Sequence, residues 1–182
     1  MDKTAAQADL RRAHINGAPG VLVSGLIWLA TGLLWYLDGP REAFIFLFFG
    51  GMAIAPLAAL LTRFGFKALA ATIGKPLEKI ALVTVPIILA GFFIAWRWFG
   101  MASAQAIPIV AIAIGLRYLT FKAMFGTGTF LMLGAAFVLI GAAALLVSSN
   151  LAGAAALLLG LVELAFFAAL YRAWRRPLEA GA

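Results

Sequence analysis

The chain has 182 residues, of which 65% are hydrophobic and only 12% are charged. Soluble domains contain roughly 45–50% apolar and about 25% charged residues, so this composition excludes an ordinary soluble fold and indicates a membrane protein. The net charge of +7 could suggest nucleic-acid binding. However, the basic residues lie beside the ends of apolar runs, so we expect anionic lipid headgroups at the cytoplasmic face as partners, and no nucleic acid. With no Cys and one His, we expect no metal and no cofactor.

The segment 1–17 is mostly polar or small, and we expect it to remain as a cytoplasmic interfacial segment because it lacks the pattern of a cleaved signal peptide. Thr4 and Gln7 have the spacing of a capping box, which predicts a short helix here. We expect Asp9 to face away from the apolar side of that helix.

Six apolar runs follow, each close to the length of about 20 residues that crosses a bilayer. Backbone groups inside lipid must be paired within their own segment, and long runs without alternation indicate helices rather than a barrel. The predicted fold is therefore all-α, a single transmembrane domain of six helices in three hairpins, with a cytoplasmic tail at 172–182. The predicted spans are about 19–37, 43–62, 80–96, 105–119, 127–147 and 151–171.

The distribution of Lys and Arg predicts the orientation. Of the 14 basic residues, eleven lie on one side of the predicted bilayer, only Arg41 and Arg97 lie on the other, and Arg117 lies within a span. Basic residues favour the cytoplasmic side, so both termini are expected in the cytoplasm.

An internal repeat is indicated by the glycines. Residues 25–63 align without a gap on residues 134–172, which places Gly25 on Gly134 and Gly32 on Gly141. Some of these matches are expected by chance in a chain rich in Ala, Gly and Leu. A repeated hairpin with glycines seven residues apart would let helices approach closely, and the same small-residue faces would suit a homo-oligomer.

Three segments resemble an uncharacterised bacterial family of six-helix membrane proteins. They are residues 6–12 (AQADLRR), 17–29 (GAPGVLVSGLIWL) and 115–121 (GLRYLTF). The resemblance implies the six-helix fold and a bacterial inner membrane, and it implies no activity. The glycine-marked hairpins are more loosely similar to those of HdeD acid-resistance membrane proteins, and the size and three-hairpin plan to acid-gated urea channels.

Two ionisable residues lie inside the predicted spans. Glu163 falls near the middle of the sixth span and Arg117 near the cytoplasmic end of the fourth, and at these depths their side chains could meet. An intramembrane carboxylate is costly unless it is neutral or partnered. One interpretation is a structural ion pair, or an Arg117 that reaches toward the headgroups beside Tyr118. The other is a proton- or substrate-responsive pair that lines a cytoplasm-facing cavity.

Other polar residues are candidates for the same pathway. Ser24 in the first span and Thr84 in the third are predicted in the cytoplasmic third of the bilayer, although most such hydroxyls bond only to their own helix. Pro86 should loosen the third helix near Leu82 because proline has no backbone N–H. His14, just outside the first span, is a candidate pH sensor.

The functional prediction remains open between two classes. No carboxylate pair, nucleophile elbow or phosphate-binding loop is present in the sequence, so we expect that the protein is not an enzyme. One class is a small-solute or proton-linked channel or transporter, with Glu163 as its protonatable gate and Arg117 as the counter-charge. The alternative is a non-transporting structural or accessory protein of the membrane, including a stress-response role.

Overall fold

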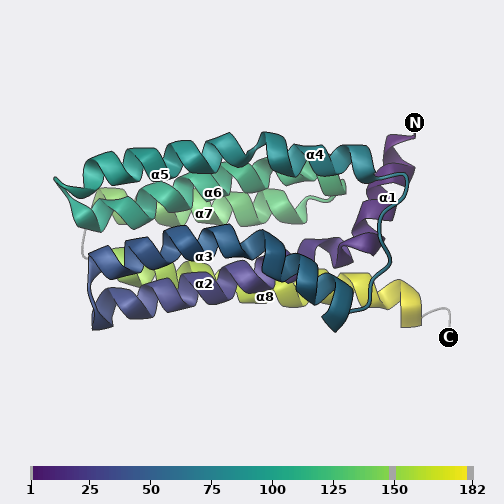
Figure 1. Ribbon diagram of the computed structural model, residues 1–182, viewed down its shortest axis with the longest axis horizontal. Helices are drawn as coiled ribbons and strands as arrows, with labels where there is room; N and C mark the ends of the chain where they lie inside the picture. The colour runs from purple at the N-terminus through teal and green to yellow at the C-terminus, as the bar shows by residue number, and fades with distance from the viewer. Residues whose placement is uncertain (1, 148–150, 180–182) are drawn as a thin grey trace.

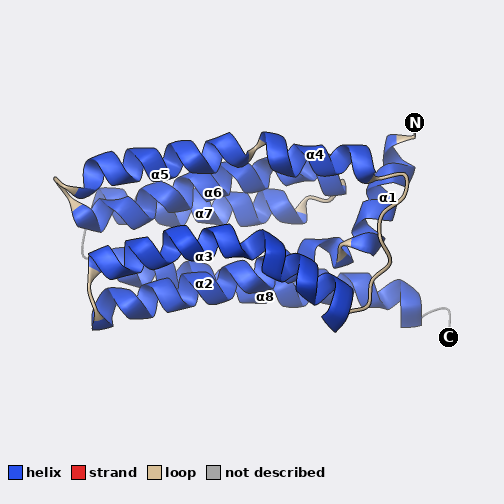
Figure 2. Cartoon of the chain, viewed as in Figure 1, coloured by secondary structure: helices blue, strands red, loops and turns tan. Residues whose placement is uncertain are grey.

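The computed structural model describes residues 2–147 and 151–179. Within these ranges the chain is mostly helical, with loops between the helices, and contains no strand, which confirms the all-α prediction (Figure 2). The elements are α1 (Lys3–Ala13), a 3-10 turn (Ile15–Gly17), α2 (Ala18–Leu37), α3 (Pro40–Leu60), a π-helical turn (Leu61–Gly65), α4 (Lys75–Val83), α5 (Val85–Phe99), α6 (Ser103–Phe125), α7 (Thr129–Val147) and α8 (Ala152–Glu179).

Six helical segments are long and apolar enough to cross a membrane, as predicted. They are Ile15–Leu37, Pro40–Gly65, Lys75–Phe99, Ser103–Phe125, Thr129–Val147 and Ala152–Arg175. Most of them extend beyond the predicted spans because the helices continue past their apolar part into the polar ends, where hydropathy falls but backbone hydrogen bonds persist.

The six long helices run side by side, and α1 lies across one end of the bundle (Figure 1). The end of α8 and the segment between α3 and α4 lie at that same end, so the elements that carry most of the basic residues are gathered there. The largest helix interfaces join α6 to α7 and α2 to α8, followed by α5 with α6 and α2 with α3. The interface of α7 with α8 is smaller, although these helices are consecutive.

Glycines set the distance between the helices of the two largest interfaces. A Cβ atom added at Gly160 in α8 would lie 2.8 Å from the carbonyl oxygen of Gly25 in α2. A Cβ atom at Gly134 in α7 would lie 2.7 Å from the carbonyl oxygen of Gly115 in α6. The sequence repeat aligns Gly25 with Gly134, and both glycines lie where the backbone of one helix touches the backbone of another.

The capping-box prediction for α1 is wrong. The residue that caps the helix is Asp2, whose side chain accepts a hydrogen bond of 2.9 Å from the backbone N–H of Thr4. Gln7 does not fold back onto its own helix, because its Nε2 donates to the carbonyl oxygen of Ala123 at the end of α6 at 2.9 Å. A tertiary contact has replaced the local one.

The prediction that Asp9 faces away from the apolar side of α1 is wrong. Asp9 is buried, with 7% of its surface exposed. Its Oδ2 accepts hydrogen bonds from the backbone N–H groups of Thr72, at 2.7 Å, and of Gly74, at 3.0 Å. These bonds, led by that from Gly74, lower the pKa of Asp9 below its ordinary value. Asp9 therefore fastens α1 to the segment that leads into α4.

Replacing Gly160 with Ala is expected to destabilise the protein, because the new methyl group meets backbone atoms of α2 that cannot move aside. Overpacking of this kind costs about 1–3 kcal/mol. Gly100→Ala adds the same methyl group where no atom lies within 4 Å, and it should leave stability nearly unchanged. Thermal unfolding in detergent measures both variants, and equal melting temperatures would contradict close packing of α2 on α8.

Asp9→Ala is expected to speed amide hydrogen exchange at Thr72 and Gly74, since their acceptor is lost. A lowered pKa means that the bonds stabilise the fold above the ordinary pKa of 3.8 and are lost as pH falls through the lowered value. Protection factors at the two amides should therefore fall in acid in the wild type only. Asp2→Ala, which removes a cap at the exposed start of α1, serves as the control; unchanged protection in Asp9→Ala would contradict the assignment.

Candidate functional site

The side chain of Glu163 is completely buried near the middle of the α8 span. Gly25 of α2 lies directly beside it, because a Cβ atom at Gly25 would be 3.1 Å from the Cβ of Glu163. From α6, the hydroxyl of Tyr118 donates a hydrogen bond to Oε1 of Glu163. The carboxyl group thus lies where α2, α6 and α8 meet.

The second carboxyl oxygen, Oε2 of Glu163, has no hydrogen-bond partner among the described residues. The hydroxyl of Ser24, which is 2% exposed, lies beside both Glu163 and Tyr118. We call Ser24, Tyr118 and Glu163 the Glu163 cluster. It places three polar groups in a region whose other buried side chains are mostly apolar.

Aromatic rings fix the position of the Tyr118 phenol. Tyr118 is 8% exposed, and its ring packs edge-on against Phe137, at 5.4 Å between centroids, and stacks near Phe130 at 6.1 Å. Such contacts restrict the ring to one orientation. The hydroxyl of Tyr118 is consequently directed to the carboxyl group of Glu163.

A second polar group surrounds the interruption between α4 and α5. The regular helix stops at Val83 and resumes at Val85, with Pro86 in the first turn of α5. Proline cannot donate a backbone hydrogen bond, which accounts for the interruption at the predicted place. The Thr84 hydroxyl bonds to carbonyl oxygens of the preceding turn, at 2.9 Å and 3.2 Å.

Arg117 of α6 binds this interruption. Its Nη2 donates to the carbonyl oxygen of Ala81 at 3.1 Å, and its Nε donates to the Thr84 hydroxyl at 3.4 Å. Its guanidinium carbon also lies 5.3 Å from the centre of the Phe121 ring, which is close enough for a cation–π attraction. We call Thr84 and the Ala81 carbonyl, the two acceptors of Arg117, the Thr84 break.

The structure therefore separates the predicted pathway residues into two groups. Ser24 lies with Glu163, and Thr84 lies with Arg117. Among the described residues, no ion pair joins Arg117 to Glu163. The two groups are connected instead through the backbone of α6, since Arg117 and Tyr118 are consecutive residues that point to different neighbouring helices.

His14, the candidate pH sensor, belongs to neither group. It follows the last residue of α1, and its Nε2 lies 3.0 Å from Oε1 of Glu78 near the start of α4. Both side chains are about two-fifths exposed, at 40% and 41%. This contact adds to the attachment of α1 at the end of the bundle.

Tyr118 is the residue that the sequence analysis missed. The sequence analysis names it only as the neighbour of Arg117, yet it is a buried partner of Glu163. Its position immediately after Arg117 was the available signal, because consecutive helix residues point about 100° apart, so both cannot face the same surroundings.

Tyr118→Phe is expected to destabilise the folded state by about 1–2 kcal/mol, because the substitution leaves Oε1 of Glu163 buried without its donor. Tyr36→Phe makes the same chemical change at a residue that is 59% exposed, and it should alter stability little. Thermal unfolding of the two variants in one detergent provides the comparison. A melting temperature for Tyr118→Phe equal to that of Tyr36→Phe would rule out a stabilising Tyr118–Glu163 bond.

Comparison with known proteins gave one family. The model of a family of unknown function, DUF7010, matches residues 4–173. No curated protein and no solved structure matched the chain. The matched region runs from the first turn of α1 to residue 173 in α8, and it includes the Glu163 cluster and the Thr84 break. The chain therefore belongs to the DUF7010 family.

Proposed function

We propose that the protein is a multi-pass protein of the bacterial inner membrane, with both termini in the cytoplasm, that permits proton-linked passage of a small solute. In this proposal Glu163 is the protonatable group, and neither an enzymatic reaction nor a cofactor takes part. The gathering of basic residues at the end of the bundle that holds α1 supports the orientation (Figure 1). We also propose that the six long helices are arranged as three repeated hairpins.

The observation that carries the proposal is the environment of the Glu163 carboxyl group. Burying an ionised carboxylate without a cationic partner costs on the order of several kcal/mol. Glu163 is completely buried and has hydroxyl neighbours rather than a basic one, and its Oε2 is unpaired among the described residues. Intramembrane carboxyl groups in such surroundings often mark proton or solute pathways.

The two polar groups suggest how a proton could alter the helices. A change of charge on Glu163 would change its bond to Tyr118, and Tyr118 is fixed to Arg117 by one peptide unit of α6. Arg117 in turn bonds to the Thr84 break, where the helix ladder is already interrupted. We propose that α6 transmits the change from one group to the other, so Arg117 acts on α4 and α5 and is not a counter-charge for Glu163.

One observation favours the second class, a structural or accessory membrane protein. The Glu163 cluster lies directly beside the Gly25–Gly160 contact, where α2 and α8 are packed backbone to backbone. A hydrogen bond from Tyr118 at that junction would join α6 to this pair even if no proton or solute ever passed.

The expected result is flux through reconstituted wild-type protein that Glu163→Gln abolishes or makes independent of pH. Proteoliposomes would carry a trapped pH indicator for protons, with urea as the small neutral solute, from about pH 5 to about pH 8. Glu42→Gln is the matched control, because Glu42 lies in the exposed first turn of α3.

Flux that survives Glu163→Gln unchanged would contradict the role of Glu163. Flux lost equally in Glu42→Gln would contradict it as well, because the loss would not depend on the buried site. If the folded wild type carries neither protons nor urea, permeation of these species is excluded and the structural class is favoured.

A further inference from the structure

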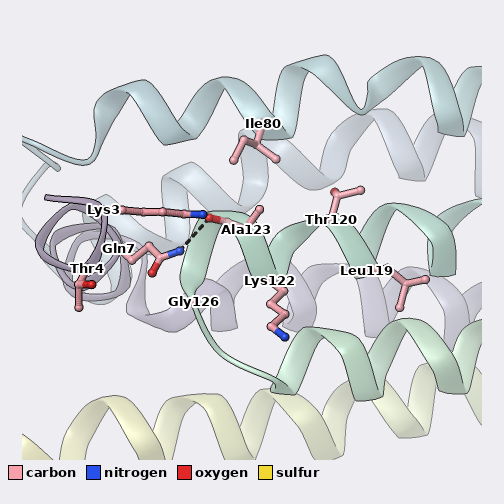
Figure 3. A pocket seen from close by; sticks show the side chains of 9 residues that line it. All are labelled: Lys3, Thr4, Gln7, Ile80, Leu119, Thr120, Lys122, Ala123 and Gly126. Atoms are coloured by element: carbon pink, nitrogen blue, oxygen red, sulfur yellow. Dashed lines mark hydrogen bonds between the residues drawn. The ribbon is translucent and has the colours of Figure 1, made fainter. Parts of the chain in front are cut away.

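A cavity of about 640 Å³ lies at the basic end of the bundle, where α1 crosses α4 and α6 (Figure 3). Its lining residues include none of the Glu163 cluster or the Thr84 break. Its lining residues come from α1, α4 and the last turns of α6. They are Lys3, Thr4, Gln7, Ile80, Leu119, Thr120, Lys122, Ala123 and Gly126.

The charged groups of the cavity are all positive. Lys3 extends from α1 toward α6, Lys122 projects from α6, and no Asp or Glu lines the cavity (Figure 3). Neither lysine forms an ion pair within the part of the chain that the structure describes. Two exposed ammonium groups without an acidic partner favour an anionic ligand.

The other polar groups are partly used by the protein itself. The Nε2 of Gln7 donates to the carbonyl oxygen of Ala123, which holds α1, the helix that carries Lys3, against α6, the helix that carries Lys122 (Figure 3). Thr120 donates its hydroxyl to the Arg117 carbonyl oxygen at 2.6 Å. The two lysine ammonium groups, the Thr4 hydroxyl and the second N–H of the Gln7 amide are therefore available as donors to a ligand.

The apolar part of the cavity belongs to helices that can cross the membrane. Ile80 lies in the Lys75–Phe99 segment and Leu119 in the Ser103–Phe125 segment. A ligand that extends along these side chains would pass from the basic end of the bundle toward its apolar middle. This arrangement fits a molecule with an anionic head and a hydrocarbon tail better than a fully soluble anion.

We propose that this cavity binds an anionic phospholipid, with its phosphate group between Lys3 and Lys122 and its acyl chain beside Ile80 and Leu119. Basic pockets between helices at the cytoplasmic side of a membrane are typical sites for anionic headgroups. Because α1 provides Lys3, lipid binding would also hold α1 in its position across the end of the bundle. The proposal rests on the proposed orientation, with this end of the bundle in the cytoplasm, and it does not depend on permeation.

The test compares lipid binding to wild-type protein and to Lys3→Gln/Lys122→Gln, with native mass spectrometry of protein in detergent. The lipids are phosphatidylglycerol and phosphatidylcholine, and glycerol 3-phosphate represents the free phosphate ester. The control is Lys67→Gln/Lys79→Gln, which removes the same charge at exposed lysines that do not line the cavity.

Wild type should prefer phosphatidylglycerol, and the Lys3/Lys122 variant should bind it about twenty-fivefold more weakly, since each lysine near an anionic surface contributes about fivefold. The control should retain the preference. Equal loss in the control, or no loss in the Lys3/Lys122 variant, would overturn the proposal. Glycerol 3-phosphate that binds as tightly as the lipid would identify a soluble phosphate ligand and would overturn the lipid assignment.

Discussion

The contact between α2 and α8 at Gly25 and Gly160 is the constraint on which the interior depends. Lipid tails are as apolar as leucine, so helices in a bilayer associate through close packing and hydrogen bonds rather than through burial of apolar surface. These two glycines allow backbone contact between the first and last long helices. Glu163 lies one helical turn from Gly160, so the close contact also encloses its carboxyl group. Packing and the buried polar site are thus consequences of the same feature.

The hydrogen bond from Tyr118 extends this pair to α6, and α6 is the helix that links the rest of the bundle. It has large interfaces with both α5 and α7, and Arg117 connects it to the Thr84 break. A hydrogen bond between helices in a membrane interior contributes about 1–2 kcal/mol at most. Such bonds therefore favour one arrangement of the helices over others, while close packing holds the helices together. A helix with polar contacts on two sides is well suited to transmit a change from one side to the other.

Hydropathy alone predicts the six long helices, because a helix that crosses a bilayer needs only sufficient length and low charge. It can be recognised without knowing which helices pack against it. The interruption near Pro86 was equally predictable, since it follows from a missing N–H. The partner of Glu163 was not, because α6 and α7 are apolar on nearly every face and hydropathy does not indicate their rotation. The burial of Asp9 was missed for a related reason: the groups that donate to its carboxylate, the backbone N–H groups of Thr72 and Gly74, lie far away in the sequence.

Infrared spectroscopy of the Glu163 carboxyl group tests the central claim, a buried carboxyl bonded by Tyr118, most directly. The difference spectrum between wild type and Glu163→Gln assigns the carboxyl band, which is then compared in Tyr118→Phe and Tyr36→Phe. The band should shift in Tyr118→Phe, because the donor to Oε1 is removed, and should stay in place in Tyr36→Phe. A Glu163 band that is identical in all three backgrounds, or that matches a carboxyl group in water, would contradict this structure of the site.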